Sequence, residues 1–478
     1  MVQRRTDAPS RSRRLHRRAA GMAVRTLAGL AAGSLAGCAV LPPGFDVLGG
    51  GKHTDTVLTG YVGTVVADEP QAALTGRDVL AHGGNAADAA TATALALSVT
   101  LPSRASLGGG GACIAARPGE APQSFLFLPA APQNAASSAP AGARPAAVPM
   151  TPRGLFLMQL RYGSVEFADT MQPAIALARN GITVSRAFGA DLAAVHNALL
   201  ADETARNTFT RAEDAVLQDG DALSQPQLAN FLERISHVGV GDLYNGALGA
   251  IYAESASAAG GALDVAALRT ALPAQVPSLQ VTSGRNTAYF LPPPADGGYG
   301  AASMVRNGGS AQGAVAAWRA AHAAGGNSTD LVAAAQAALD SGARGNGALG
   351  ALPASTSLVV TDRQGGAVAC ALTDGNLFGT GRVAPGTGVV IGASPAHGPQ
   401  PLLGAAIVQS RGTLRGALAS SGQNDAADAL GAGTQAVLQD AALPHEGSGR
   451  LNAAVCRGGT CIGETDPRGT GLATGDDR

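Results

Sequence analysis

Residues 354–373 read ASTSLVVTDRQGGAVACALT and carry the clearest structural pattern in the chain. Two runs rich in β-branched and small apolar residues flank a glycine-containing turn, which is the pattern of a β-hairpin. With the turn centred near Gln364, Ser355 and Thr373 are equally far from the centre and lie opposite each other. Directly opposed side chains are about 5 Å apart at Cβ. The hairpin therefore brings two hydroxyls together at its open end, and Ser355 shares a strand face with Ser357.

The composition indicates a globular chain with no electrostatic signature of a special partner. The 478 residues are 46% hydrophobic and 14% charged, enough for one large domain or two medium ones. A net charge of −1 gives no case for nucleic acid. Lys52 is the only lysine, so a Schiff-base or phosphate-loop lysine elsewhere is excluded. We expect no cofactor and no metal site.

The N-terminal residues have the pattern of an export signal. Arginines dominate the first 18 residues, an apolar run covers residues 22–35, and the sequence LAGC ends at Cys38. A basic region, a short apolar region and small residues predict a signal peptide over residues 1–37, starting at Met1 or Met22. The LAGC ending resembles a bacterial lipobox with Cys38 as the lipidated residue, and an ordinary signal peptide or a short anchor is the alternative. With a lipid on Cys38, residues 38–58 are expected to form a Pro/Gly-rich tether, and the protein is expected to face the periplasm on a lipid anchor.

The other cysteines fall into two groups. Cys456 and Cys461 flank an expected hairpin turn, RGGT, where a disulfide and a pair of free thiols are both compatible with the sequence. No histidine lies near them at zinc-ligand spacing. Cys113 and Cys370 lie in apolar, strand-like runs and are expected to be buried small hydrophobic residues. A catalytic Cys370 is the alternative.

Helix signals stand out between residues 68 and 99. Residues 62–67 read as a strand, and Asp68 is expected to cap a helix that begins near Pro70. Asn85 is expected to cap the next helix, over residues 86–99. That helix is rich in alanine on all sides, which predicts burial between layers.

Residues 362–381 read DRQGGAVACALTDGNLFGTG and resemble, without a gap, the start of the small subunit of γ-glutamyltransferases. These enzymes are N-terminal-nucleophile hydrolases. The similarity continues in GGNAADAA at residues 83–90, in LPPPADGG at residues 291–298 and in DPR at residues 466–468, so that it covers most of residues 60–470. It implies an α/β (α+β) fold, the four-layer αββα sandwich. Residues 59–354 are then the large-subunit-like segment and residues 355–478 the small-subunit-like segment of one composite domain.

The resemblance also implies the chemistry. The family's precursor cuts itself before a threonine in a T-T-H-x-S-V-V-D motif, and that threonine falls on Ser355 here. The cut then lies between Ala354 and Ser355, and the freed α-amine of Ser355, with a pKa near ~8, is the base for its own hydroxyl. The family's second active-site threonine falls on Thr373, which would orient the nucleophile. A register shifted by one residue makes Thr356 the nucleophile instead.

Several binding residues of the family are replaced. The family's double-glycine oxyanion loop falls on Gly422 and Gln423, whose backbone N–H groups remain. The arginine of the family's R-E-x-A-P motif falls on Leu128, and no acid stands in residues 392–398, where the family has an acidic pair. Two carboxylate-binding serines are replaced by Leu403 and Gly404. Arg104 and Arg382 are candidates for a substitute cation.

Three functional hypotheses follow from the resemblance and its departures. The first is a self-processing amidohydrolase or acyltransferase that forms a processed heterodimer and cleaves γ-glutamyl amides such as glutathione. The second is a catalytically inactive family member that acts as an exported binding or scaffold lipoprotein. The third is an acylase for a changed, less charged acyl group.

Overall fold

The hairpin predicted from residues 354–373 forms the centre of a sheet. Strand β9 (Thr356–Asp362) pairs antiparallel with β10 (Ala367–Thr373), and Leu372 lies opposite Thr356. The next pair in this register is Ser355 and Thr373, as the sequence predicts.

Two antiparallel sheets carry most of the strands. The first has seven strands, in the spatial order β17 (Leu472–Thr474), β1 (Gly63–Ala67), β9, β10, β2 (Gly110–Ala116), β3 (Gln123–Phe127) and β6 (Ala274–Pro277). The second has six, in the order β16 (Thr460–Glu464), β15 (Arg450–Arg457), β14 (Thr413–Ser421), β13 (Gly404–Ser410), β8 (Asn286–Phe290) and β7 (Leu279–Ser283).

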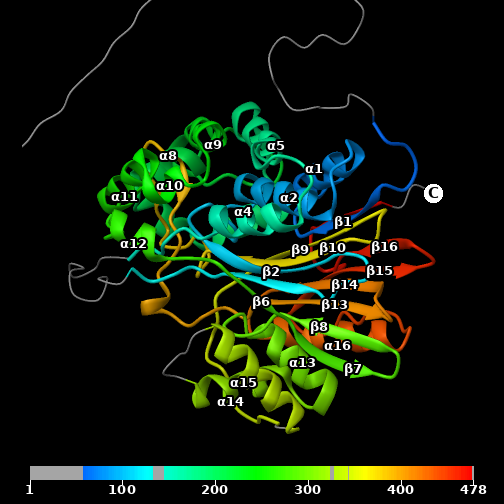
Figure 1. Cartoon of the computed structure of the whole chain (residues 1–478). Helices are drawn as coiled ribbons and strands as arrows, with labels where there is room; N and C mark the ends of the chain where they lie inside the picture. The colour runs from blue at the N-terminus through cyan, green and yellow to red at the C-terminus, as the bar shows by residue number, and fades with distance from the viewer. Residues whose placement is uncertain (1–56, 133–144, 323–327, 343, 476–478) are drawn as a thin grey trace, which may run out of the picture. The chain divides into compact units, whose positions relative to one another are not determined.

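The two sheets pack face to face and helices cover both outer faces (Figure 1). Side chains alternate along each strand. Leu358 and Val360 of β9 therefore join a core shared with the upper helices, whereas Val359 joins a core shared with the second sheet. The order of layers is helix, sheet, sheet, helix, which confirms the predicted four-layer fold.

The helices of the first outer layer include α1 (Pro70–Ala81), α2 (Ala86–Thr100), α4 (Thr151–Tyr162), α5 (Phe167–Asn180) and α9 (Pro226–Val238). Those of the second are α13 (Gly297–Asn307), α14 (Ala311–Ala321), α15 (Ser328–Asp340) and α16 (Ala426–Leu438). Further helices extend the first layer: α6 (Arg186–Ala194), α7 (His196–Leu200), α8 (Glu203–Phe209), α10 (Asp242–Asn245), α11 (Ala247–Ala258) and α12 (Val265–Thr270). Two small ribbons are formed by β4 (Ile182–Thr183) with β5 (Ala222–Leu223), and by β11 (Val383–Ala384) with β12 (Val389–Val390).

The N-cap of α2 is the residue predicted from the sequence, whereas the N-cap of α1 is not. Asn85 and Asp88 form a capping box at the start of α2, and every residue of that helix is buried, as predicted. The prediction for α1 is wrong: Glu69, not Asp68, is its N-cap and accepts a hydrogen bond from the Ala72 N–H. Asp68 is directed instead toward β9, as described below.

Four cysteines form two disulfides. Cys456 and Cys461 are bonded across the β15–β16 hairpin, which is one of the two alternatives stated above. The expectation that Cys113 and Cys370 are free buried residues is wrong, because they face each other on β2 and β10 and are bonded. Since its sulfur is in a disulfide, Cys370 has no thiol to act as a nucleophile.

The structure is a computed structural model that describes residues 57–132, 145–322, 328–342 and 344–475. The predicted signal peptide, Cys38 and the tether up to residue 56 lie outside these residues. Within the described ranges, no helix has the length and apolar character needed to cross a membrane.

Candidate active site

Three strand ends meet where the two sheets face each other. Ser355 precedes β9, Thr373 ends β10, and Gly422 follows β14 of the other sheet. An isolated bridge joins Ser355 to Gly422, with 3.1 Å from the Ser355 N to the Gly422 carbonyl oxygen. The Ser355 Oγ also lies 3.4 Å from that oxygen. Both predicted catalytic hydroxyls and the predicted oxyanion loop are therefore brought together, and Ser355 and Thr373 are buried.

The hydroxyl of Thr373 contacts the peptide bond at which we expect the cut. Its Oγ1 donates to the Ala354 carbonyl oxygen at 3.1 Å and accepts from the Gly375 N–H at 3.0 Å. The carbonyl that Ser355 would attack is thus already polarised by a hydroxyl in the uncut chain.

A buried polar cluster holds the start of β9 in place. The Asp68 carboxylate accepts hydrogen bonds from the Thr356 hydroxyl and the Ser357 N–H, both at 3.0 Å. The Asn452 amide donates to Asp68 at 2.8 Å and to the Ser357 hydroxyl at 2.9 Å. The hydroxyl of Thr356, the alternative nucleophile, is therefore engaged by a carboxylate, whereas that of Ser355 lies beside Gly422.

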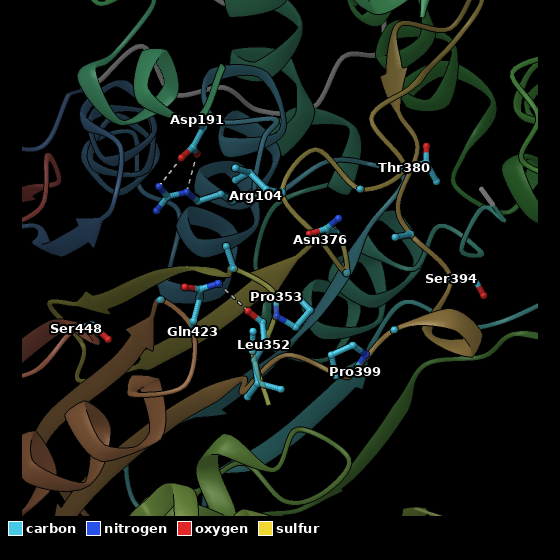
Figure 2. A pocket seen from close by; sticks show the side chains of 18 of the residues that line it. Arg104, Asp191, Leu352, Pro353, Asn376, Thr380, Ser394, Pro399, Gln423 and Ser448 are labelled. Atoms are coloured by element: carbon cyan, nitrogen blue, oxygen red, sulfur yellow. Dashed lines mark hydrogen bonds and ion pairs between the residues drawn. The ribbon is translucent and has the colours of Figure 1, made fainter. Parts of the chain in front are cut away.

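A cavity of about 800 Å³ adjoins these residues and is lined by residues 351–354, by Gly422 and Gln423, and by two arginines (Figure 2). Arg104 forms two hydrogen bonds of 2.7 Å with the Asp191 carboxylate. Burial lowers the pKa of Arg104, but the hydrogen bonds and charge of Asp191, with a further contribution from Asp68, outweigh it and raise the pKa overall. Arg450, at the start of β15, has no ion pair or side-chain hydrogen bond among the described residues.

Asp374, the residue after Thr373, is a buried carboxyl. Its Oδ1 accepts from the Ser106 N–H at 2.9 Å and from the Ser106 hydroxyl at 2.7 Å, while its Oδ2 has no partner among the described residues. Burial raises the pKa of Asp374 to about 7, because the two hydrogen bonds from Ser106 offset only part of the desolvation.

Sequence reasoning missed Asp68, Asn452, Asp374 and Arg450. Asp68 carried a signal that pointed elsewhere, since an acid before Pro70 is typical of a helix cap. The other three carried no local signal. Asn452 and Asp374 join the site through contacts with distant segments, and Arg450 lines the cavity because β15 begins there.

A family model for γ-glutamyltranspeptidase matches residues 72–308. Over these residues, the chain matches the γ-glutamyltranspeptidase family. The matched residues lie in the predicted large-subunit-like segment and end before Ser355.

Curated relatives of the family align over part of their length. Glutathione hydrolase 3 of Arabidopsis thaliana is 32% identical over 254 residues, which are 51% of this chain and 40% of the relative. The glutathione hydrolase proenzyme of Escherichia coli K12 is 30% identical over 296 residues, 57% of this chain and 49% of the relative. The chain thus spans half or less of the length of these relatives.

Solved structures of low sequence identity share the fold. The cephalosporin acylase from Bacillus halodurans superposes with a TM-score of 0.72 at 18% identity, covering 87% of this chain and 96% of the acylase. The γ-glutamyltranspeptidase of Helicobacter pylori gives a TM-score of 0.52 at 22% identity, with 61% of this chain and 95% of the other covered.

Two positions where the family has binding residues are apolar here, and one of the candidate substitute cations is hydrogen-bonded outside the cavity. Leu403 is fully buried between the sheets and Leu128 packs against the same core. The Arg382 guanidinium donates to the Ala259 carbonyl, and Arg382 is not among the described residues that line the cavity. Of the two candidate substitute cations, Arg104 alone lines the cavity.

Proposed function

We propose that this γ-glutamyltranspeptidase-family chain is a self-processing amidohydrolase or acyltransferase. It would cleave γ-glutamyl amides such as glutathione through an acyl-enzyme on Ser355. The observation that carries the proposal is the contact of the Thr373 hydroxyl with the Ala354 carbonyl oxygen, directly before buried Ser355. This is the position at which the family's precursor cuts itself.

Self-processing begins with an acyl shift. The Ser355 Oγ bonds to the carbonyl carbon of Ala354, the C–N bond to Ser355 breaks, and the hydroxyl proton goes to the released amine. Water then hydrolyses the ester, which leaves a carboxylate on Ala354 and a free hydroxyl and α-amine on Ser355. The amine, with a pKa near ~8, is partly neutral at neutral pH and can act as a base.

Turnover repeats this chemistry on an external amide. The α-amine takes the proton of the Ser355 hydroxyl, which attacks the substrate carbonyl, and the leaving amine departs with that proton. Backbone N–H groups of Gly422 and Gln423 are the proposed donors to the developing oxyanion. Water or an acceptor amine then resolves the ester, which gives hydrolysis or transfer.

The second candidate is an acylase for a less charged acyl group. Leu128 and Leu403 stand where the family has polar or charged residues that bind the γ-glutamyl group. Losing a bidentate arginine contact to a carboxylate is a large change in recognition, which favours an apolar acyl group.

Intact masses of the purified protein under denaturing and reducing conditions test self-processing. We expect two fragments that meet between Ala354 and Ser355, a single chain for Ser355→Ala, and unchanged cutting for Thr356→Val. The processed protein should then release 4-nitroaniline from γ-glutamyl-4-nitroanilide. A wild-type chain that stays intact would leave the catalytically inactive scaffold as the remaining hypothesis.

We also propose that the protein is exported and anchored on the periplasmic side by lipid on Cys38. The support is the sequence pattern of residues 1–38, a basic and then apolar stretch that ends in LAGC. Cys38→Ala should move the protein from the membrane fraction to the soluble fraction. We further propose that, after the cut, the large-subunit-like and small-subunit-like segments remain together as a heterodimer.

A further inference from the structure

Residues 349–354, which precede the expected cut, are bound to the site like a peptide ligand. The Gln423 amide donates to the Leu352 carbonyl oxygen at 2.8 Å, a contact visible in Figure 2. The Asn424 amide donates to the carbonyl oxygens of Leu349 at 3.2 Å and Gly350 at 2.8 Å. Its own oxygen accepts from the Leu352 N–H at 3.1 Å. The side chains of Gln423 and of the next residue, Asn424, therefore make four hydrogen bonds to the backbone of residues 349–352.

The side chain of Leu352 fills an apolar pocket. It is 4% exposed and belongs to a small buried cluster of alanine, valine and leucine side chains from α14, α16 and the segment before β13: Ala311, Val315, Leu402, Ala426 and Ala427. Pro353 is also buried, while Ala354 is half-buried and lines the cavity. The third residue before the cut thus has a side-chain pocket, in addition to the backbone contacts.

The ester formed in self-processing and the acyl-enzyme formed in turnover share one bond. In both, an acyl carbon is attached to the Ser355 Oγ. Contacts that hold the acyl chain of the first can therefore hold the acyl chain of the second, once the residues up to Ala354 have left after hydrolysis.

We propose that the processed site cleaves amide bonds on the carboxyl side of an extended peptide whose third residue before the bond is apolar. The proposal rests on the proposed function of Ser355 and adds a peptide acyl group to its substrates. Gln423 and Asn424 are the specificity-determining residues, because they bind the peptide backbone, and the cluster around Leu352 selects the side chain. Ser355 attacks the carbonyl, the amine leaves with the hydroxyl proton, and water releases the peptide as a carboxylate.

The test compares three 4-nitroanilides on the processed protein. Acetyl-Leu-Pro-Ala-4-nitroanilide reproduces the contacts of Leu352, which are the apolar pocket and one hydrogen bond each with Gln423 and Asn424. Acetyl-Asp-Pro-Ala-4-nitroanilide places a charge in that pocket, and acetyl-Ala-4-nitroanilide reaches neither Gln423 nor Asn424. We expect kcat/KM for the first to exceed that for the second at least roughly tenfold, because burying an unpaired carboxylate is costly. The free peptide acetyl-Leu-Pro-Ala should inhibit competitively, whereas its Asp counterpart should not.

Variants of Gln423 and Asn424 distinguish a loss of peptide binding from a general loss of activity. In Gln423→Ala and Asn424→Ala, the ratio of kcat/KM for the tripeptide to that for acetyl-Ala-4-nitroanilide should fall roughly tenfold, since each variant loses one hydrogen bond to the leucine of the peptide. The ratio should be unchanged in Gln439→Ala, an exposed glutamine at the end of α16. Intact masses of every variant establish that it is processed before the rates are compared.

The experiments distinguish failure of the proposed function from failure of the peptide proposal. A wild-type chain that is never cut overturns the proposed function itself. A fully cut protein that hydrolyses γ-glutamyl-4-nitroanilide but not the tripeptide anilide overturns the peptide proposal alone. Equal kcat/KM for the Leu and Asp peptides, or an unchanged ratio in both variants, also overturns it.

Discussion

The Thr373 hydroxyl donates to the Ala354 carbonyl oxygen, which belongs to the peptide bond where we propose that the chain cuts itself. Thr373→Val keeps the shape of the side chain and removes the donor. We expect it to slow self-cleavage roughly a hundredfold, the usual cost of one lost oxyanion donor. Thr373→Ser keeps the donor and should cut at nearly the wild-type rate. The fraction of cut chain against time, from intact masses, measures this, and equal rates for Val and wild type would contradict the assigned role.

Asp374, one residue further, makes stability depend on pH. Its pKa is about 7 in the folded chain against an ordinary value of 3.8. Below about pH 4 both states hold the proton; between about pH 4 and 7 the unfolded state loses it while the folded state keeps it. The free energy of unfolding therefore falls across that window and levels off above it.

Asp374→Asn should remove this pH dependence, because asparagine keeps the acceptor for Ser106 and does not ionise. The variant should gain stability relative to wild type between pH 4 and pH 8, by up to about 4 kcal/mol at pH 8. Urea unfolding at the two pH values gives the difference. If the difference in unfolding free energy between Asp374→Asn and wild type were the same at pH 4 and pH 8, the pKa of Asp374 would not be raised by folding.

At the scale of elements, the hairpin and α2 could be predicted because their signals are local. The β9–β10 register depends on one turn, and the capping box of α2 on two neighbouring residues, Asn85 and Asp88. The family resemblance supplied the four layers. The N-cap of α1 shows where local signals fail. Asp68 has the local pattern of a cap, but its carboxylate accepts a hydrogen bond from β9, and Glu69 caps the helix instead.

The rest of the site could not be read from the sequence, because it is assembled across strands of different sheets. Asp68, Ser357 and Asn452 meet only because β1, β9 and β15 come together. The same is true of Cys113 and Cys370, which are 257 residues apart and become neighbours through the pairing of β2 with β10.

The contact of α1 with α2 offers a test of packing between elements. A Cβ at Gly76 of α1 would lie 2.2 Å from the Thr93 Oγ1 of α2 and 3.0 Å from a methyl of Val65. Gly76→Ala should therefore destabilise the chain by about 1–3 kcal/mol, despite the better helix propensity of alanine. Gly241→Ala is the matched control, since Gly241 has helical backbone angles and nothing within 4 Å of an added Cβ. Equal unfolding free energies for the two variants would mean that α1 is not held close to α2.

At the scale of the whole molecule, the order of strands determines whether the two segments separate after a cut between residues 354 and 355. Strands β9 and β10 of the small-subunit-like segment lie between β1 and β2 of the large one. The Cys113–Cys370 disulfide then joins the two segments across the β2–β10 pair. A chain cut at the proposed position should therefore remain a covalent heterodimer, held by this bond as well as by the sheet.

Denaturing gels of the processed protein with and without reductant test this link. Without reductant we expect one species of full mass, and with reductant two fragments. The double variant Cys113→Ala/Cys370→Ala should give two fragments in both gels and should unfold more easily, by about 2–5 kcal/mol. Cys456→Ala/Cys461→Ala is the matched control, because both of its cysteines lie in the small segment and its loss leaves the fragments linked. Two wild-type fragments without reductant would mean that Cys113 and Cys370 are free thiols, and that the sheet alone holds the two segments together.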